Sequence, residues 1–114
     1  MSRTRASAKQ AGTKWESAIV TYLIERGFPG IERRAKAGAN DKGDISGLPL
    51  VIEAKDCRQM TLSGWLEEAR VEADNADVAI GVVWAKKRGQ GSPARGYVVM
   101  DGESFTRLLH AAGL

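Results

Sequence analysis

The chain has 114 residues, a net charge of +3 and a single cysteine. At this length it is expected to form one domain with one modest core, and the lack of a long apolar run excludes a membrane-spanning helix. One cysteine excludes an internal disulfide and multi-cysteine zinc sites and suits a reducing cytosol, so we expect a cytoplasmic protein. Cys57 itself is expected to be a small, semi-buried apolar residue.

Basic residues gather in two segments that contain no acids. They are Arg3, Arg5, Lys9 and Lys14 in the first segment, and Lys86, Lys87, Arg88 and Arg95 in the second. Such segments either contact a phosphate backbone or form solvated charge runs. Because residues 1–12 show no apolar periodicity, we predict a basic, disordered arm there and a single folded domain over residues 13–114.

A first helix is predicted to begin near Thr13 and to end at Gly27. Apolar residues recur there at helical spacing, and they are Trp15, Ala18, Ile19, Tyr22 and Leu23. Glu16 projects into this apolar arc. Its carboxylate either reaches toward the helix start, where the dipole favours it, or points at a metal-bearing sheet.

Residues 31–35 are predicted to form a strand that contains Arg33 and Arg34. Since neighbouring residues of a strand point to opposite faces, we expect at most one of these arginines to reach a functional site. An edge strand with exposed basic residues is the alternative.

The central stretch is a predicted hairpin over residues 43–55. Asp44 opens its first strand, and residues 50–54 form an apolar, β-branched second strand. With a period of two, Glu53 and Lys55 lie on one face. A pair of carboxylates on rigid strands can bind a hard cation such as Mg²⁺, and the lysine would then meet phosphate or the attacking water. A cross-strand ion pair is the alternative interpretation.

Another helix is predicted over residues 63–75. Its apolar stripe consists of Leu62, Trp65, Leu66, Ala69 and Ala73. Its charged residues are assigned to a solvated face, and they are Glu67, Glu68, Arg70, Glu72 and Asp74.

The C-terminal part is predicted to contain two strands and a last helix. Residues 78–84 are continuously apolar, which indicates a central strand joined to the hairpin by a parallel crossover. A strand over residues 96–100 follows. Asp101 is the predicted N-cap of the last helix, whose buried side is expected to consist of Phe105, Leu108 and Leu109. The predicted order is αβββαββα.

Asp44 followed by Glu53-Ala54-Lys55, in this order of elements, resembles the PD-(D/E)XK nuclease superfamily, with Gly43 in place of the motif's proline. The resemblance implies an α/β fold with a restriction-endonuclease-like αβββαβ core, in which helices flank a mixed central sheet. It also implies that Asp44, Glu53 and the Ala54 backbone carbonyl bind the metal, and that Lys55 orients or activates water.

The chain further resembles the small Holliday junction resolvases of this superfamily, archaeal and phage-encoded, in which a glutamate on the first helix joins the metal site. Glu16 matches that glutamate. The implied catalytic residues are therefore Glu16, Asp44, Glu53 and Lys55.

The implied activity is that of a Mg²⁺-dependent endodeoxyribonuclease, with Mn²⁺ as an alternative ion, in the cytoplasm of a bacterial or phage-infected cell. A four-way junction is two-fold symmetric, so symmetric cutting calls for a homodimer. The expected contacts to branched or duplex DNA are Arg33, Arg34, Lys86, Lys87, Arg88 and Arg95.

Other classes of function stay open. The chain could be a non-catalytic DNA-binding module with this fold, a less selective duplex or flap nuclease, or a purely structural protein. A degenerate site would be expected to have lost one of Asp44, Glu53 or Lys55, and all are present. A histidine-metal nuclease needs more histidine than His110, which we expect to be exposed.

Overall fold

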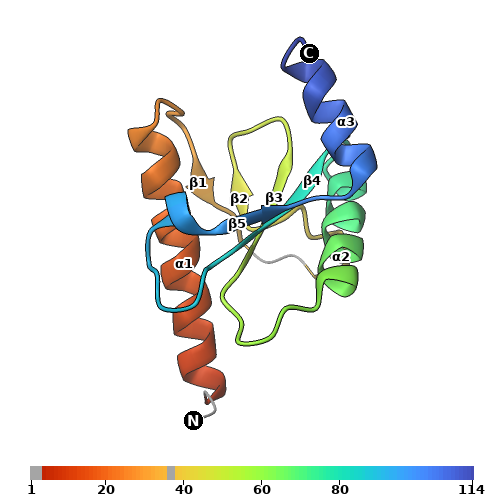
Figure 1. Cartoon of the computed structure of the whole chain (residues 1–114). Helices are drawn as coiled ribbons and strands as arrows, with labels where there is room; N and C mark the ends of the chain where they lie inside the picture. Colours follow the sequence, from red (N-terminus) through yellow and green to blue (C-terminus); the bar gives the residue numbers. More distant parts are fainter. Residues whose placement is uncertain (1–3, 36–37) are drawn as a thin grey trace.

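The structure is a computed structural model that describes residues 4–35 and 38–114. Over these residues the chain forms α1 (Arg5–Glu25), β1 (Glu32–Arg33), η1 (Gly38–Asn40), β2 (Ile45–Ser46), β3 (Val51–Lys55), α2 (Leu62–Asn75), β4 (Gly81–Ala85), η2 (Pro93–Arg95), β5 (Tyr97–Val99) and α3 (Gly102–Ala111), as Figure 1 shows. The predicted α/β class and the predicted order of helices and strands are confirmed.

The strands form one mixed sheet in the order β1-β2-β3-β4-β5. β3 and β4 pair in parallel, and the other neighbouring strands pair antiparallel. The parallel register places Glu53 beside Val83 and Lys55 beside Ala85. The predicted crossover through the second helix is therefore confirmed.

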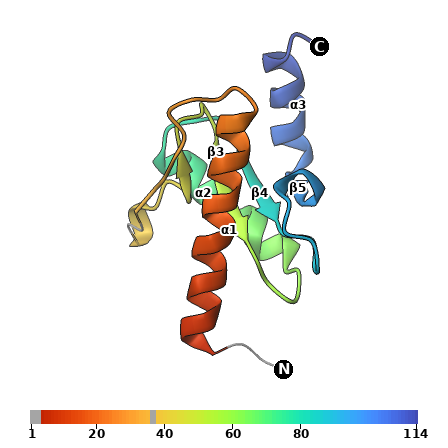
Figure 2. The same ribbon diagram turned by 90° about the vertical axis from the view of Figure 1, so that its left-hand side faces the viewer.

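Helices cover both faces of the sheet: α1 lies on one side and α2 on the other (Figures 1 and 2). Along β4, Val82 and Trp84 pack in the cluster on the α1 side, whereas Val83 and Ala85 pack in the cluster on the α2 side. β4 is buried at every position, as predicted for a central strand. Glycine at position 81 permits close packing, because a Cβ there would lie 2.5 Å from the backbone oxygen of Ala69.

The first helix begins at Arg5 rather than near Thr13. Residues 5–12 are mostly alanine, arginine, lysine and glutamine, which favour helix without needing an apolar stripe. Thr4 caps this start, because its Oγ1 accepts a 3.1 Å hydrogen bond from the Ser7 N–H. The prediction of a disordered arm is therefore wrong for residues 5–12, and residues 1–3 lie outside the described residues. Within the described part of the chain, no helix is long and apolar enough to cross a bilayer.

Two other boundaries differ from the predictions. β1 has only two residues, and β4 begins at Gly81 rather than at Val78. The reason at β4 is that the Val78 N–H still bonds the Ala73 oxygen at 3.0 Å, within the turn that ends α2.

The last helix has the predicted cap but not the predicted burial. Oδ1 of Asp101 accepts a 2.7 Å hydrogen bond from the Ser104 N–H, which confirms the N-cap. Phe105, however, is 50% exposed, and Leu108 and Leu109 are only partly buried. α3 follows the edge strand β5 and lies at the periphery of the molecule (Figure 1), so its inner face is covered only in part.

Candidate functional site

Asp44 stands immediately before β2 and is held firmly by backbone hydrogen bonds. Its N–H donates to the Ile52 oxygen at 3.0 Å, and its own carbonyl accepts from the Arg34 N–H at 2.8 Å. Its side chain is 1% exposed, and Oδ2 accepts a 2.8 Å hydrogen bond from the Ala54 N–H. The hairpin therefore fixes this carboxylate beside β3, as the sequence predicted.

Gly43, at the place of the motif's proline, has a φ of +96°. Proline is restricted to a φ of about −65° and has no N–H, so it cannot adopt this conformation. The Gly43 N–H is also used, since it donates a 2.9 Å hydrogen bond to Oδ1 of Asp41. The departure from the motif is therefore a requirement of this turn.

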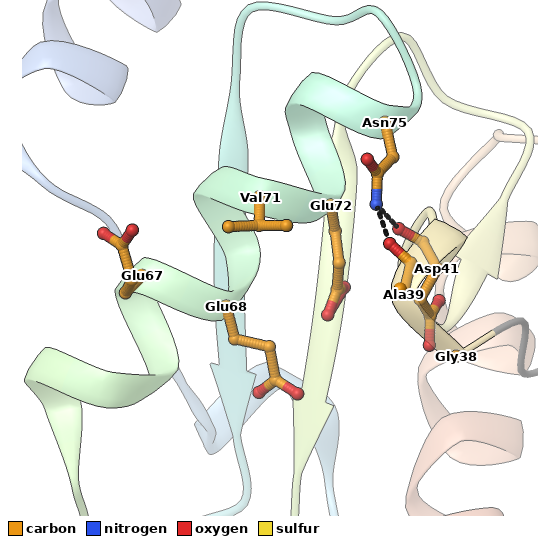
Figure 3. A pocket seen from close by; sticks show the side chains of 8 residues that line it. All are labelled: Gly38, Ala39, Asp41, Glu67, Glu68, Val71, Glu72 and Asn75. Carbon is orange, nitrogen blue, oxygen red and sulfur yellow. Dashed lines mark hydrogen bonds between the residues drawn. The ribbon is translucent and has the colours of Figure 1, made fainter.

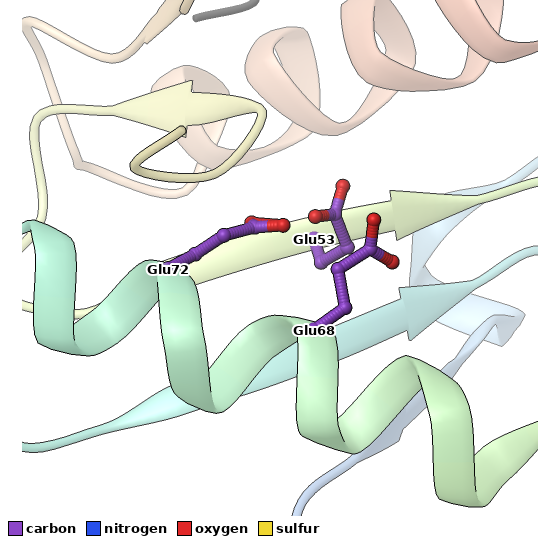
Figure 4. A group of neighbouring side chains, drawn as sticks. All are labelled: Glu53, Glu68 and Glu72. Carbon is purple, nitrogen blue, oxygen red and sulfur yellow. The ribbon is translucent and has the colours of Figure 1, made fainter. Parts of the chain in front are cut away.

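Glu53 lies in β3 among other acids. Figure 4 shows that its carboxyl group converges with those of Glu68 and Glu72 from α2, and ligand oxygens of the three lie within 4.8 Å of one another. Burial, together with side-chain hydrogen bonds to Asp44 and Glu72, raises the pKa of Glu53 to about 12. Burial also raises the pKa of Glu72; its side-chain hydrogen bond with Glu53 opposes this shift, and the nearby charges of Glu68, Asp41 and Asp44 add to it. The fold thus gathers carboxyl groups that repel one another when ionised.

Sequence analysis missed Glu72. It was assigned to the solvated face of its helix, yet it is 4% exposed and points toward β3 (Figure 4). A signal was present, because Glu72 follows Trp65 and Ala69 at helical spacing and so shares their buried side. Glu68 is exposed, as predicted, but its carboxylate also belongs to the cluster.

Lys55 lies at the end of β3 as a charged group. Its Nζ is 2.8 Å from Oε1 of Glu68 and 5.9 Å from the centre of the Trp65 ring. Burial by itself lowers the pKa of Lys55, but the hydrogen bond to Glu68 and the charge of Glu53 outweigh it, so the pKa is raised overall. The side chain therefore presents an ammonium group rather than a neutral amine.

A cleft of about 390 Å³ brings most of the predicted site together. The residues that line it include Lys9, Glu16, Arg33, Arg34, Glu53, Ala54, Lys55 and Glu68. α1 forms one wall, the end of β1 another, and the end of β3 the floor. Asp44 is buried and lies behind the cleft, where its carboxyl group is hydrogen-bonded to two lining residues, the Glu53 side chain and the Ala54 N–H. Lys9 was not among the predicted DNA contacts, because the segment that carries it was expected to be disordered.

Glu16 faces this cleft from the middle of α1. Because the helix begins at Arg5, the carboxylate is too far along the chain to interact with the helix start, and that interpretation is wrong. Glu16 is buried and accepts a 3.3 Å hydrogen bond from Nε of Arg33. The acid is therefore oriented by an arginine at the cleft.

Both Arg33 and Arg34 line the cleft, although strand alternation predicted that at most one would. β1 ends at Arg33, so Arg34 lies beyond the strand, where neighbouring side chains need not point to opposite faces. Two neighbouring arginines consequently contribute to the lining of the cleft.

The second basic segment lines a neighbouring cavity of about 260 Å³. The basic residues that line this cavity are Lys86, Lys87 and Arg88 of that segment, together with Arg58. Cys57 lines both cavities and is exposed, contrary to the prediction, because it lies past the end of β3 where the chain leaves the sheet. Arg95 is exposed in η2, and among the described residues it lines neither cavity. His110 is exposed, as expected.

Comparisons of the chain with protein-family models, with curated proteins and with solved structures found no match. The resemblance to PD-(D/E)XK nucleases therefore stays a prediction from the motif and the order of elements. The function has to be argued from the chemistry of the cleft.

Proposed function

We propose that this protein is a metal-dependent, structure-selective DNA endonuclease that resolves four-way junctions by phosphodiester hydrolysis. The observation that carries the proposal is the convergence of Glu16, Glu53, Lys55 and two arginines on one cleft. A phosphodiester nuclease needs carboxylates for a cation and basic groups for the backbone, and both sets are present here.

The carboxylates suit Mg²⁺, with Mn²⁺ as an alternative. Asp44 and Glu53 would hold the ion, with Glu16 and the Ala54 carbonyl as further ligands, since hard cations prefer oxygen. The raised pKa of Glu53 supports this fit, because a cation placed among these carboxyl groups would replace a proton and offset their repulsion. When bound, the ion would polarise the phosphate and lower the pKa of water.

Lys55 would act as a fixed positive charge. Burial by itself lowers its pKa, but the hydrogen bond to Glu68 and the charge of Glu53 outweigh burial and raise the pKa, so it is protonated at neutral pH in the metal-free protein. Positioned beside Glu53 in the cleft, the ammonium would orient water and stabilise negative charge that develops on the phosphate. Glu68, 2.8 Å away, holds the ammonium in place.

The basic residues favour recognition of DNA shape over sequence. Arg33 and Arg34 in the cleft would hold one backbone, and Lys86 to Arg88 in the neighbouring cavity would hold another. Contacts of this kind position DNA without reading bases. Symmetric cleavage of a junction would need two such sites, hence a homodimer.

A competition assay tests the proposal. A labelled four-way junction is mixed with an excess of linear duplex that carries a second, distinguishable label, Mg²⁺ is added, and Lys55→Ala serves as the control. Paired symmetric cuts by the wild type, lost in the variant, are expected. Equal cutting of both DNAs would remove junction selectivity, and binding without cutting under Mg²⁺ or Mn²⁺ would refute the nuclease activity in favour of a binding module.

A further inference from the structure

The carboxylates of Glu53, Glu68 and Glu72 have the spacing of ligands around one cation. Their ligand oxygens lie within 4.8 Å of one another. Oxygens on opposite sides of Mg²⁺ or Ca²⁺ are about 4 to 5 Å apart, given the usual bond lengths. Figure 4 shows that the three side chains point toward one another from β3 and from successive turns of α2.

Glu72 supplies an independent observation. Its side chain is 4% exposed and points into the cluster. Its Oε2 is buried and has no hydrogen-bond partner among the residues that the structure describes. Buried carboxylate oxygens normally have a hydrogen-bond partner, because an unpaired buried polar group lowers the free energy of unfolding. Gly43 lies beside this oxygen: a Cβ at that position would be in van der Waals contact with it at 3.5 Å, and glycine leaves that contact unmade.

A separate cavity of about 250 Å³ on the α2 side is lined by two members of the cluster, Glu68 and Glu72 (Figure 3). Its acidic lining residues are Asp41, Glu67, Glu68 and Glu72, and among the described residues no lysine or arginine lines it. One wall is braced by Asn75, whose amide donates to the oxygens of Ala39 at 3.0 Å and Asp41 at 2.9 Å. Such a concave, single-sign surface concentrates cations.

Lys55 does not neutralise the whole cluster. Its ammonium contacts Oε1 of Glu68 on the cleft side. A carboxylate has two oxygens, so Glu68 can keep Lys55 on one and offer the other to a metal ion. Glu72 is not part of the cleft lining, and its Oε2 stays without a hydrogen-bond partner among the described residues.

We infer that Glu53, Glu68 and Glu72 form a second divalent-cation position, with Glu72 as its buried ligand and the α2-side cavity as its entrance. It takes a hard ion such as Mg²⁺, Mn²⁺ or Ca²⁺. The inference rests on the proposed function only for its link to catalysis, because cation binding can be measured without DNA.

Titration of Mn²⁺ into the DNA-free protein, followed by electron paramagnetic resonance and calorimetry, tests this inference. Glu72→Gln is compared with the control variant Glu67→Gln. Glu67 is an exposed acid on the same helix and lines the same cavity, but it lies outside the cluster and its carboxylate pairs with Arg70 at 2.6 Å. We expect Glu67→Gln to bind as the wild type does and Glu72→Gln to bind one ion at least ten times more weakly. Wild-type affinity and stoichiometry in Glu72→Gln would overturn the inference.

The metal-free melting temperature separates a ligand from a structural residue. Glutamine at position 72 keeps an amide oxygen that can accept the hydrogen bond from Glu53 and removes like-charge repulsion, so metal-free Glu72→Gln should melt no lower than the wild type. A large drop in melting temperature would show that Glu72 stabilises the fold rather than binding a cation.

Glu68→Gln, at a more exposed position, is a second variant that should weaken the same Mn²⁺ binding step. If the wild type binds Mn²⁺ but does not cleave DNA, the proposed function is refuted and the cation site stands. If the wild type cleaves DNA and Glu72→Gln binds Mn²⁺ as the wild type does, the cation site is refuted and the proposed function stands.

Discussion

The N–H of Ala54 donates a 2.8 Å hydrogen bond to Oδ2 of Asp44, so the backbone of β3 itself orients this buried carboxylate. Asparagine can keep the hydrogen bond through its carbonyl oxygen while losing the charge. We expect Asp44→Asn to reduce Mg²⁺-dependent cleavage on the order of 100-fold or more and to change the unfolding free energy by less than about 1 kcal/mol. Cleavage assays and denaturant titration measure the two effects. A loss of several kcal/mol would indicate a structural ion pair instead.

Lys55→Met should separate catalysis from binding. The variant keeps the apolar stem but loses the ammonium beside Glu68 and Trp65, so single-turnover cleavage is expected to fall roughly 100-fold or more. Affinity for DNA should change little, because Arg33 and Arg34 remain. Lys55→Arg, which retains the charge, should recover part of the rate. Equal losses of affinity and rate would argue that Lys55 only holds the backbone.

Lys9 and Lys14 form a matched pair on α1. Lys9 lines the cleft, whereas Lys14 is exposed and does not belong to its lining. If Lys9 contacts a phosphate, Lys9→Ala should reduce the slope of log affinity against log salt by about 0.9, while Lys14→Ala leaves it unchanged. Fluorescence anisotropy with junction DNA at several salt concentrations measures both slopes. Identical slopes for the two variants would remove Lys9 from the interface.

Gly43 and Gly30 allow backbone strain to be separated from steric contact. Both have positive φ, but a Cβ at Gly43 would lie 2.7 Å from Cγ1 of Val51, whereas a Cβ at Gly30 would have no atom within 4 Å among the described residues. We expect Gly30→Ala to cost about 1 kcal/mol and Gly43→Ala clearly more, from strain plus the contact. Urea denaturation compares them. Equal costs would mean that Val51 moves aside freely.

Asp101 should stabilise α3 in a pH-dependent way. Its hydrogen bond from the Ser104 N–H lowers the pKa of the carboxyl group below its ordinary value of 3.8. The stabilisation is therefore complete above pH 3.8 and is lost as the pH falls through the lowered folded-state pKa. At pH 7, Asp101→Ala should cost about 1 kcal/mol. Asp101→Asn, also a good cap, should show no such pH dependence in denaturant titrations.

Local patterns predicted the hairpin and the Asp101 cap of the last helix. The alternation that places Glu53 and Lys55 on one face needs only the geometry of a single strand, and Asp101 needs only the residues that follow it. These features depend on short-range sequence, so they could be inferred without knowing how the elements pack.

Features that depend on packing between elements could not be predicted in the same way. Glu72 was assigned by its charge, yet its place on the buried side of α2 puts it against β3. Lys9 reaches the cleft only because good helix formers extend α1 past its apolar stripe. Arg34 reaches it because β1 is too short for alternation to continue.

The single cysteine has a practical consequence. Cys57 is exposed and lies between the cleft that contains Glu16 and Glu53 and the neighbouring basic cavity, as part of the lining of both. A maleimide fluorophore would therefore attach at one defined position, without any engineered thiol, where its emission should respond when a nucleic acid strand passes from one cavity to the other.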